Sequence, residues 1–154
     1  GLKNFKGVQR RFNKIFTFNG VDFYDDYAHH PTEIRSVLEG VKKVFDKSER
    51  VCIFQPHRIT RLKDLRNEFT HCFRDADTII LCPIYTAGEK IKLGFNYNDF
   101  AKEIIKNSKV KLFMIKNNIE LAKFLKQNIY GNKIVIGMGA GSISNWMKKL
   151  PELM

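Results

Sequence analysis

The strongest constraint on the fold is the alternation of two apolar patterns along the chain. Short runs rich in β-branched residues are each followed by a segment whose apolar residues recur three or four positions apart, as on one face of a helix. The strand-like runs lie at 51–54, 78–82, 110–115 and 134–136. The helix-like segments lie at 31–45, 59–73, 100–105, 121–129 and 142–150. Strands that alternate with helices predict an α/β fold, with a mostly parallel sheet and helices on both faces.

The N-terminal part of the chain predicts a different local structure, a β-hairpin. Two short apolar runs, 15–18 and 21–24, flank Asn19-Gly20, and both of these residues tolerate the positive φ of a tight turn. No internal repeat and no Pro/Gly/Ser-rich linker interrupts the chain. Residues 1–154 are therefore predicted to form a single domain.

The composition favours a folded protein without a membrane span. The apolar fraction is 44% with 13 phenylalanines, which is enough for a core. No apolar run approaches the roughly 18 residues that a membrane span needs, and the first residues do not resemble a signal peptide. A cytoplasmic location is therefore expected. Cys52, Cys72 and Cys82 show no C-x-x-C spacing, so we expect buried, reduced thiols and neither a zinc site nor a disulfide.

The net charge of +11 suits an anionic partner, such as a nucleic acid, a phosphate or an acidic membrane. Many of the lysines fall on the expected solvent faces of helices, and a solvated surface explains them. A nucleic-acid-binding module remains an alternative, but no recognition helix and no set of base-stacking aromatic residues stands out. We expect no nucleic-acid partner and no membrane partner.

The first polar cluster, at 25–31, lies between a predicted strand and a predicted helix. It contains two carboxylates, a phenol and two imidazoles, followed by Pro31, which suits the first position of a helix. Such groups can bind ribose hydroxyls, hold a metal or transfer protons. The alternative is a solvated loop in which His30 caps the helix. A metal site is disfavoured because no third ligand has a suitable spacing.

The second cluster, at 55–61, lies where a predicted strand ends and a helix begins. Arg58 and Arg61 are three positions apart and would share a helix face. Two guanidinium groups at a helix N-terminus oppose the helix dipole, and this unfavourable placement suggests that an anion binds there, together with the free N–H groups. The alternative is a basic turn on the surface.

The third cluster, at 137–142, follows the last predicted strand. Its glycines allow a close approach of backbone and ligand, and Ser142 can cap the following helix. The spacing differs from that of a dinucleotide fingerprint, and a tight turn is an equally good interpretation. The segment 85–89 says little alone. The chain has no G-x-x-x-x-G-K-[ST] loop to hold a triphosphate.

Taken in order, five segments resemble the Mur ligase family, and within it the member that adds alanine. The segments are 7–12, 25–33, 54–61, 85–89 and 139–142, and they span nearly the whole chain. The resemblance is to the last of the family's three domains, a Rossmann-like domain that closes over the active site. It implies that the UDP-binding first domain and the ATP-binding central domain lie outside this chain.

The resemblance assigns one set of residues to ATP and to catalysis. Arg11 matches an arginine that reaches the phosphates, and Asp26 matches an aspartate that holds the ribose. Tyr27 lies beside the nucleotide, so the ATP-binding assignments are Arg11, Asp26 and Tyr27. The catalytic assignments are His29 and His57. ATP and Mg²⁺ are the expected cofactors, with the metal ligands chiefly in the central domain and none assigned here.

The resemblance assigns a second set to the acceptor substrate. Arg58 and Arg61 match a pair that grips a carboxylate, which agrees with the anion site expected from their spacing. Tyr27, His29 and Ser142 complete the substrate-binding assignments. Ala28 stands where alanine-adding relatives often have glycine.

The implied reaction is a ligation in peptidoglycan biosynthesis. ATP phosphorylates the carboxylate of UDP-N-acetylmuramate, and the amine of L-alanine attacks the resulting acyl phosphate. The expected partners are therefore UDP-N-acetylmuramate, L-alanine, ATP and the two other domains in a bacterial cytoplasm. The alternative within the family is the ligase that recycles a murein tripeptide. This chain alone is expected to be inactive because the P-loop lies outside it.

Overall fold

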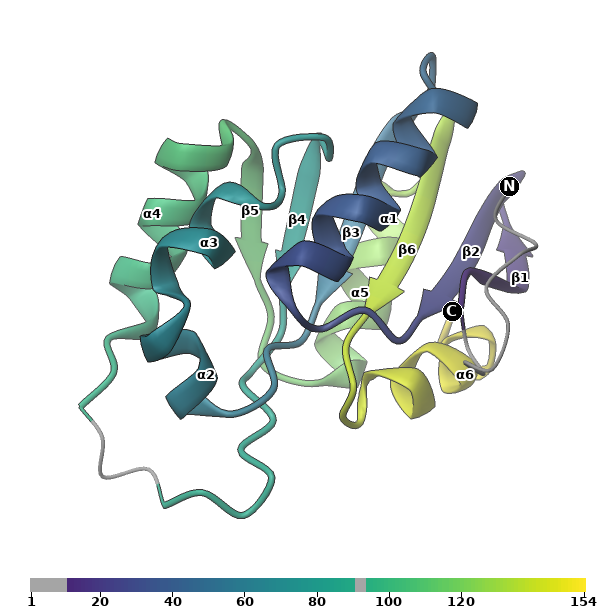
Figure 1. The fold of residues 1–154 in the computed structure, drawn as a ribbon. Helices are drawn as coiled ribbons and strands as arrows, with labels where there is room; N and C mark the ends of the chain where they lie inside the picture. Colours follow the sequence, from purple (N-terminus) through teal and green to yellow (C-terminus); the bar gives the residue numbers. More distant parts are fainter. Residues whose placement is uncertain (1–10, 91–93) are drawn as a thin grey trace.

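Six strands form one sheet in the computed structural model, which describes residues 11–90 and 94–154 (Figure 1). The strand order across the sheet is β1-β2-β6-β3-β4-β5. The strands are β1 Asn13–Phe18, β2 Val21–Asp26, β3 Glu49–Phe54, β4 Thr78–Leu81, β5 Lys111–Met114 and β6 Lys133–Met138. The helices are α1 Pro31–Val44, α2 Ile59–Asp64, α3 Arg66–His71, α4 Tyr97–Ser108, α5 Asn118–Asn128 and α6 Ile143–Leu153.

The pairing of the strands confirms the predicted sheet. β1 and β2 form the antiparallel hairpin, with Asn19 and Gly20 at φ 52° and 76° in the turn between them. All other pairs, β2–β6, β6–β3, β3–β4 and β4–β5, are parallel. Asn-Gly is favoured in such turns because both residues adopt positive φ at little cost.

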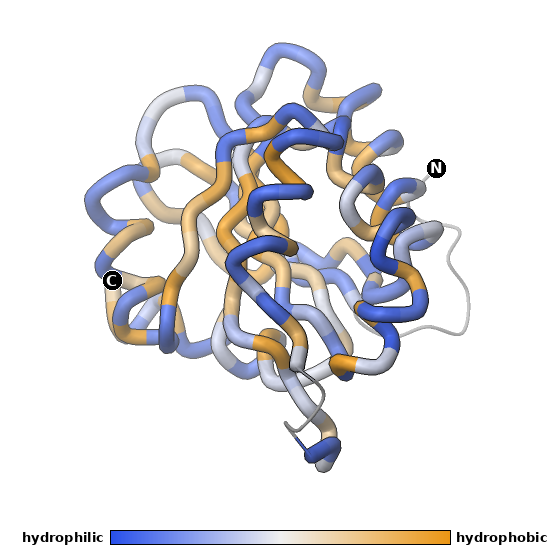
Figure 2. Tube along the Cα trace, turned by 90° about the vertical axis from the view of Figure 1, so that its left-hand side faces the viewer, coloured by the Kyte–Doolittle hydropathy of each residue, from blue (hydrophilic) through white to orange (hydrophobic). Residues whose placement is uncertain are grey.

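Helices cover both faces of the sheet, as predicted. Cys52 and Phe54 of β3 pack with α1, α2, α3 and α4 on one face. Val51 and Ile53 of the same strand pack with α5 and α6 on the other. Figure 1 shows α1 in front of the sheet and α5 behind it, and Figure 2 shows the apolar residues concentrated in the central strands. Alternate residues of a strand point to opposite faces, so a central strand covered on both sides is apolar throughout.

The helix predicted at 59–73 is interrupted, whereas the predictions for the cysteines are confirmed. The apolar pattern at 59–73 predicts one helix, but Leu65, at φ −115°, separates α2 from α3. Leu62 and Phe69 are both fully buried on either side of this break, so the spacing of apolar residues gives no sign of it. Cys52, Cys72 and Cys82 are buried free thiols, as predicted. Among the residues that the structure describes, no helix is long and apolar enough to cross a bilayer.

The strand order places a crevice at the carboxyl edge of the sheet. β6 comes last in the chain but lies between β2 and β3. The chain leaves β2 and β3 toward helices on one face, and it leaves β6 toward α6 on the other face. Loops that diverge in this way open a crevice beyond the strand ends, where ligands of open α/β sheets bind.

Candidate functional site

The three polar clusters meet at this carboxyl edge. The backbone N–H of Gly139 donates to the carbonyl of Asp26 at 3.3 Å, and that of Gln55 donates to the carbonyl of Met138 at 3.0 Å. These bonds join the loop after β2 to the loop after β6, and the loop after β3 to the end of β6. Segments more than 80 residues apart in the chain therefore share one site.

Four aromatic rings form a row across the loops that follow β2, β3 and β4. The Tyr27 and His29 ring centroids are 5.1 Å apart, and those of His29 and His57 are 5.8 Å apart, both edge to face. Tyr85 stacks on His57 at 5.5 Å with an angle of 15° between the ring planes. The predicted residues Tyr27, His29 and His57 are thus brought together. The sequence did not predict that Tyr85 joins this row of rings.

His57 is held in place by its backbone as well as by its neighbours. It forms a parallel bridge with Tyr85, in which the N–H of Arg58 donates to the carbonyl of Tyr85 and the N–H of Tyr85 donates to the carbonyl of Pro56, each at 2.8 Å. Burial lowers the pKa of His57, and the charges of His29, Arg61 and Arg58 lower it further against the opposing effect of Glu89. The imidazole is therefore neutral at neutral pH.

Arg58 and Arg61 line one cavity of about 410 Å³. The other residues that line it are His30, Thr60, Asp64 and Leu65. Nη1 of Arg61 is buried and finds no hydrogen-bond acceptor among residues 11–90 and 94–154. A buried guanidinium N–H without an acceptor is costly, so the atom is suited to an anionic ligand.

The backbone of Arg58 adopts an uncommon conformation. Its φ of 70° and ψ of 133° lie outside the regions that residues with a side chain favour, and such a residue costs about 1–3 kcal/mol. The sequence predicted that both arginines lie on one face of a helix. Arg58 instead precedes α2 in a non-helical conformation, and only Arg61 lies in the helix. Both side chains nevertheless line the same cavity.

Glu89 occupies the first amides of α2. Its Oε1 accepts hydrogen bonds from the backbone N–H of Ile59 at 2.5 Å and of Thr60 at 3.4 Å, and Oε2 accepts the Thr60 hydroxyl. The bond from that hydroxyl lowers the pKa of Glu89, which is therefore a carboxylate at neutral pH. The expectation that these N–H groups are open to an anionic ligand is wrong, because a carboxylate of the chain already binds them. The side chains of Arg58 and Arg61 therefore remain as the candidate donors to an anion in this cavity.

The two aspartates of the first cluster are buried. Oδ2 of Asp26 accepts the backbone N–H of Phe12 at 2.9 Å, and Oδ1 accepts that of Ala28 at 2.8 Å. Burial raises the pKa of Asp26 although these two bonds and the charge of Arg11 oppose the shift. Asp25 accepts a hydrogen bond from the Ser144 hydroxyl at 2.8 Å. In this arrangement Asp26 ties the loop after β2 to the start of β1, and only 1% of it is exposed.

His30 and Glu33 form the cap of α1. Nδ1 of His30 accepts the N–H of Thr32 at 3.2 Å, and Glu33 accepts the N–H of His30 at 3.1 Å, which is a capping box. Burial raises the pKa of Glu33, but the backbone bonds from His30 and His29 and the charges of His29 and Arg11 outweigh this and lower it. Arg11 lies 3.5 Å from Glu33, so the helix start and the predicted ATP-binding arginine are linked.

The glycine loop is shaped by protein groups. A Cβ on Gly141 would lie 2.4 Å from the ring of Tyr85, and one on Gly139 would lie 2.9 Å from the carbonyl of Gln55. Ser142 occupies the cap position of α6, but its side chain makes no capping bond. Its Oγ accepts a hydrogen bond from Nε2 of Gln55 at 2.9 Å. The expected cap at Ser142 is therefore wrong.

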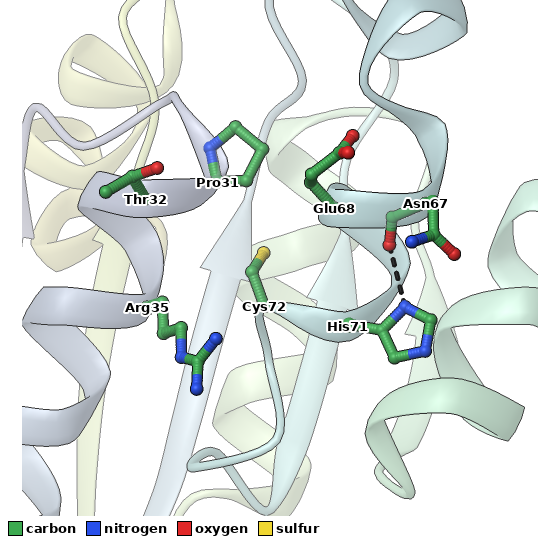
Figure 3. A pocket seen from close by; sticks show the side chains of 7 residues that line it. All are labelled: Pro31, Thr32, Arg35, Asn67, Glu68, His71 and Cys72. Atoms are coloured by element: carbon green, nitrogen blue, oxygen red, sulfur yellow. Dashed lines mark hydrogen bonds between the residues drawn. The ribbon is translucent and has the colours of Figure 1, made fainter.

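A second cavity, of about 320 Å³, lies between α1 and α3 (Figure 3). It is lined by Pro31, Thr32, Arg35, Asn67, Glu68, His71 and Cys72. Nε of Arg35 pairs with Glu39 at 3.2 Å, and Nδ1 of His71 lies 2.7 Å from the carbonyl of Asn67. This cavity shares no lining residue with the arginine cavity and contains none of the predicted site residues. No group of three or more metal-ligating side chains gathers within the described part of the chain.

Comparisons with known proteins point to one family. The family model described as Mur ligase, glutamate ligase domain, matches residues 10–141. A UDP-N-acetylmuramate–L-alanine ligase from Pelagibacter ubique is 68% identical over all 154 residues, and one from Mesorhizobium japonicum is 40% identical over 152 residues. The chain spans about a third of the length of these curated relatives, 33% and 32% respectively.

Solved structures show the same fold. The crystal structure of UDP-N-acetylmuramate-alanine ligase from Thermotoga maritima aligns with a TM-score of 0.72 and 28% identity, over 98% of this chain and 31% of that one. A murein peptide ligase from Psychrobacter arcticus aligns with a TM-score of 0.78 over 99% of this chain and 31% of that one, but at 20% identity, which shows a shared fold alone. From the sheet, the family match and the identity to its relatives, we conclude that this chain belongs to the Mur ligase family and corresponds to its glutamate ligase domain.

Proposed function

We propose that this chain is the C-terminal domain of an ATP-dependent ligase that joins L-alanine to the carboxylate of UDP-N-acetylmuramate. The support is the 68% identity of the whole chain to a third of an enzyme of that name. The first and central domains of such an enzyme would supply the UDP site and the P-loop. Two of the proposed substrates, ATP and UDP-N-acetylmuramate, are a nucleotide and a nucleotide-linked sugar, so the proposal places the enzyme in the bacterial cytoplasm.

The observation that carries the proposal is the arginine cavity beside the row of rings. The buried Nη1 of Arg61 needs an acceptor, and the carboxylate of an amino acid would provide one. Arg58 lines the same cavity and adds a second positive charge. The pair would hold the alanine carboxylate and leave the amine pointing away from the guanidinium groups, toward the activated carboxyl group.

His57 has the properties of a proton acceptor for the alanine amine. Alanine is an ammonium ion at neutral pH and must lose a proton before it attacks. His57 is neutral because its pKa is lowered, and its Nδ1 is buried without a partner within the described residues. His29 and Tyr85 contact its ring on either side and fix its orientation. A neutral imidazole can accept a proton, as general base catalysis requires.

ATP would phosphorylate the UDP-N-acetylmuramate carboxylate to an acyl phosphate, and Mg²⁺ would screen the phosphates. Arg11 and Tyr27 are the residues of this chain proposed to face the nucleotide, and Arg11 is partly exposed beside Glu33. Asp26 fits a ribose contact less directly, because both of its oxygens already accept backbone N–H groups. Each oxygen keeps a second lone pair, but only 1% of Asp26 is exposed, so a ribose contact would require neighbouring residues to move.

The alternative acceptor is the murein tripeptide. Its support is the shared fold with the murein peptide ligase, whereas the sequence identity favours alanine. The deciding experiment measures phosphate release by the full-length enzyme with UDP-N-acetylmuramate and ATP, and compares L-alanine with the tripeptide. Turnover with alanine supports the proposal. Turnover with the tripeptide alone would overturn it and keep the same site.

The 154-residue chain is expected to be inactive by itself, since no P-loop is present in its sequence. The same phosphate-release assay on this chain, with alanine and both cosubstrates, should remain at the background rate. Alanine-dependent turnover by the isolated chain would contradict the division of labour proposed here.

A further inference from the structure

Gln55 belongs to the second polar cluster, but the sequence alone assigns it no role. It follows β3 directly, and only 3% of it is exposed. Its Nε2 donates to Oγ of Ser142 at 2.9 Å, and its Oε1 accepts the backbone N–H of Ile143 at 3.0 Å. Both ends of the buried carboxamide are therefore bonded to the start of α6, almost 90 residues along the chain.

These bonds replace the cap that α6 lacks. The first amides of a helix have no partner within the helix, and the residue at the cap position usually supplies one. Ser142 stands at that position without a capping bond. Gln55 instead binds the first amide, that of Ile143, from the end of β3, the strand next to β6. The start of α6 thus depends on a residue of the β3 loop.

Gly141 packs closely against both the side chain of Gln55 and the ring of Tyr85. A Cβ on Gly141 would lie 2.8 Å from Oε1 of Gln55 and 2.4 Å from the Tyr85 ring. Tyr85 in turn stacks on His57. The glycine loop, Gln55 and the ring of His57 are therefore packed as one unit, and a displacement of the loop would be transmitted to the ring.

We infer that Gln55 is a positioning residue for alanine, which locks the 139–142 loop against the His57–Arg58 segment. The inference rests on the proposed function, because alanine is the substrate whose use would change. Gln55 lies two residues before His57 and three before Arg58. If its carboxamide is lost, that segment keeps its bridge to Tyr85 and its backbone bond to Met138 but loses both side-chain bonds to the start of α6.

The test uses three variants of the full-length enzyme and kinetics with L-alanine. Gln55→Met keeps the length of the side chain and removes both bonds, and we expect it to lower kcat/KM for alanine by about 10–100-fold, the effect of a small misplacement of reacting groups. The KM for ATP should change much less. Gln55→Glu should restore most of the loss, because its oxygens can accept from Ile143 and from a rotated Ser142 hydroxyl.

The matched control lies at the other end of the same two strands. The Ser48 hydroxyl donates to Oδ1 of Asn132 at 2.7 Å, which joins the segments before β3 and before β6. Asn132→Ala removes this bond far from the site and should leave alanine kinetics unchanged. Wild-type kcat and KM for alanine in Gln55→Met, or an equal loss in Asn132→Ala, would overturn the positioning role.

Hydrogen exchange separates this inference from the proposed function. Peptides covering 139–146 should exchange faster in Gln55→Met than in the wild type or in Asn132→Ala, because the Ile143 N–H loses its acceptor. If the wild-type enzyme does not use alanine, the proposed function fails, but faster exchange still supports the lock. Unchanged exchange would overturn the lock whatever the substrate.

Discussion

The two ends of β3 carry arginines in opposite states. At its start, Arg50 is buried, and its guanidinium donates to the carbonyls of Phe45, Ser48 and Asp75 at 3.4, 3.2 and 2.6 Å. It also lies 3.7 Å from the carboxylate of Asp77. The donors of this arginine are directed at backbone carbonyls and one carboxylate of the chain, so its charge serves the fold.

Beyond the other end of β3, Arg58 and Arg61 lack the set of backbone carbonyl acceptors that surrounds Arg50 among the described residues. Arg58 is exposed and strained, and Arg61 has a buried N–H without an acceptor among the described residues. Because buried donors are normally paired, an unpaired one at a crevice indicates a ligand, whereas a fully paired one indicates structure. The comparison therefore separates an arginine whose donors are paired within the chain from Arg61, whose buried N–H is consistent with the proposed carboxylate contact.

The largest effect is expected from Arg61→Ala in the full-length enzyme. Loss of a charge-assisted contact to the alanine carboxylate should lower kcat/KM for alanine by about 100-fold, with Arg58→Ala acting in the same direction. Arg35→Ala is the control, since Arg35 lines the cavity of Figure 3 and pairs with Glu39. Unchanged alanine kinetics in both Arg58→Ala and Arg61→Ala would remove their carboxylate role.

The next prediction compares how Arg50 and Arg58, at the two ends of β3, contribute to the free energy of unfolding. Arg50→Ala leaves several carbonyls without their donor and should lower the free energy of unfolding of the 154-residue chain by about 3 kcal/mol. Arg58→Ala should change it by about 0.5 kcal/mol or less, as expected for an exposed side chain. Urea denaturation monitored by circular dichroism measures both. Equal losses in the two variants would break the comparison.

A smaller effect should come from the backbone of Arg58. Glycine adopts positive φ without a steric penalty, so Arg58→Gly should be about 1 kcal/mol more stable than Arg58→Ala. Both variants lack the guanidinium and should lose alanine use equally. If the alanine variant is as stable as the glycine variant, the backbone of Arg58 is not strained in solution.

The smallest effect concerns His57 and its pKa. Burial and the charges of His29, Arg61 and Arg58 lower this pKa, so its value in Arg61→Ala should move back toward the usual one near 6.5. Arg50→Ala should leave it unchanged. The pKa of His57 is lower in the folded state than in the unfolded state. The contribution of His57 to the free energy of unfolding is therefore complete above pH 6.5 and is lost as the pH falls through the folded-state pKa. Titration of the His57 Cε1 proton by NMR measures the shift directly.

The sequence predicts local structure here better than it predicts contacts. The periodicity of apolar residues and the Asn19-Gly20 turn are local signals, so the hairpin and the order of strands and helices were predictable. The position of β6 between β2 and β3 depends on how strands choose neighbours, which no local pattern encodes. The pairing of Gln55 with Ser142 follows from that position and could not be predicted.

The same limit applies to the site residues. The spacing of Arg58 and Arg61 predicted an anion site, and the cavity that both line is consistent with it. The capture of the α2 amides by Glu89 depends on a loop that returns from β4, and the sequence offered no signal for it. Resemblance to the family selected Arg11, Asp26 and Tyr27, whereas the packing that buries Asp26 became visible only in the folded chain.

The parallel bridge between His57 and Tyr85 also limits how the length of the chain can vary in this family. It is an isolated bridge beyond the ends of β3 and β4, and the number of residues between Leu81 and Tyr85 sets which residue faces His57. One inserted residue there would place a different residue opposite His57 and move Tyr85 off its ring. Relatives of different length are therefore expected to carry their insertions after Glu89, where the constraint ends.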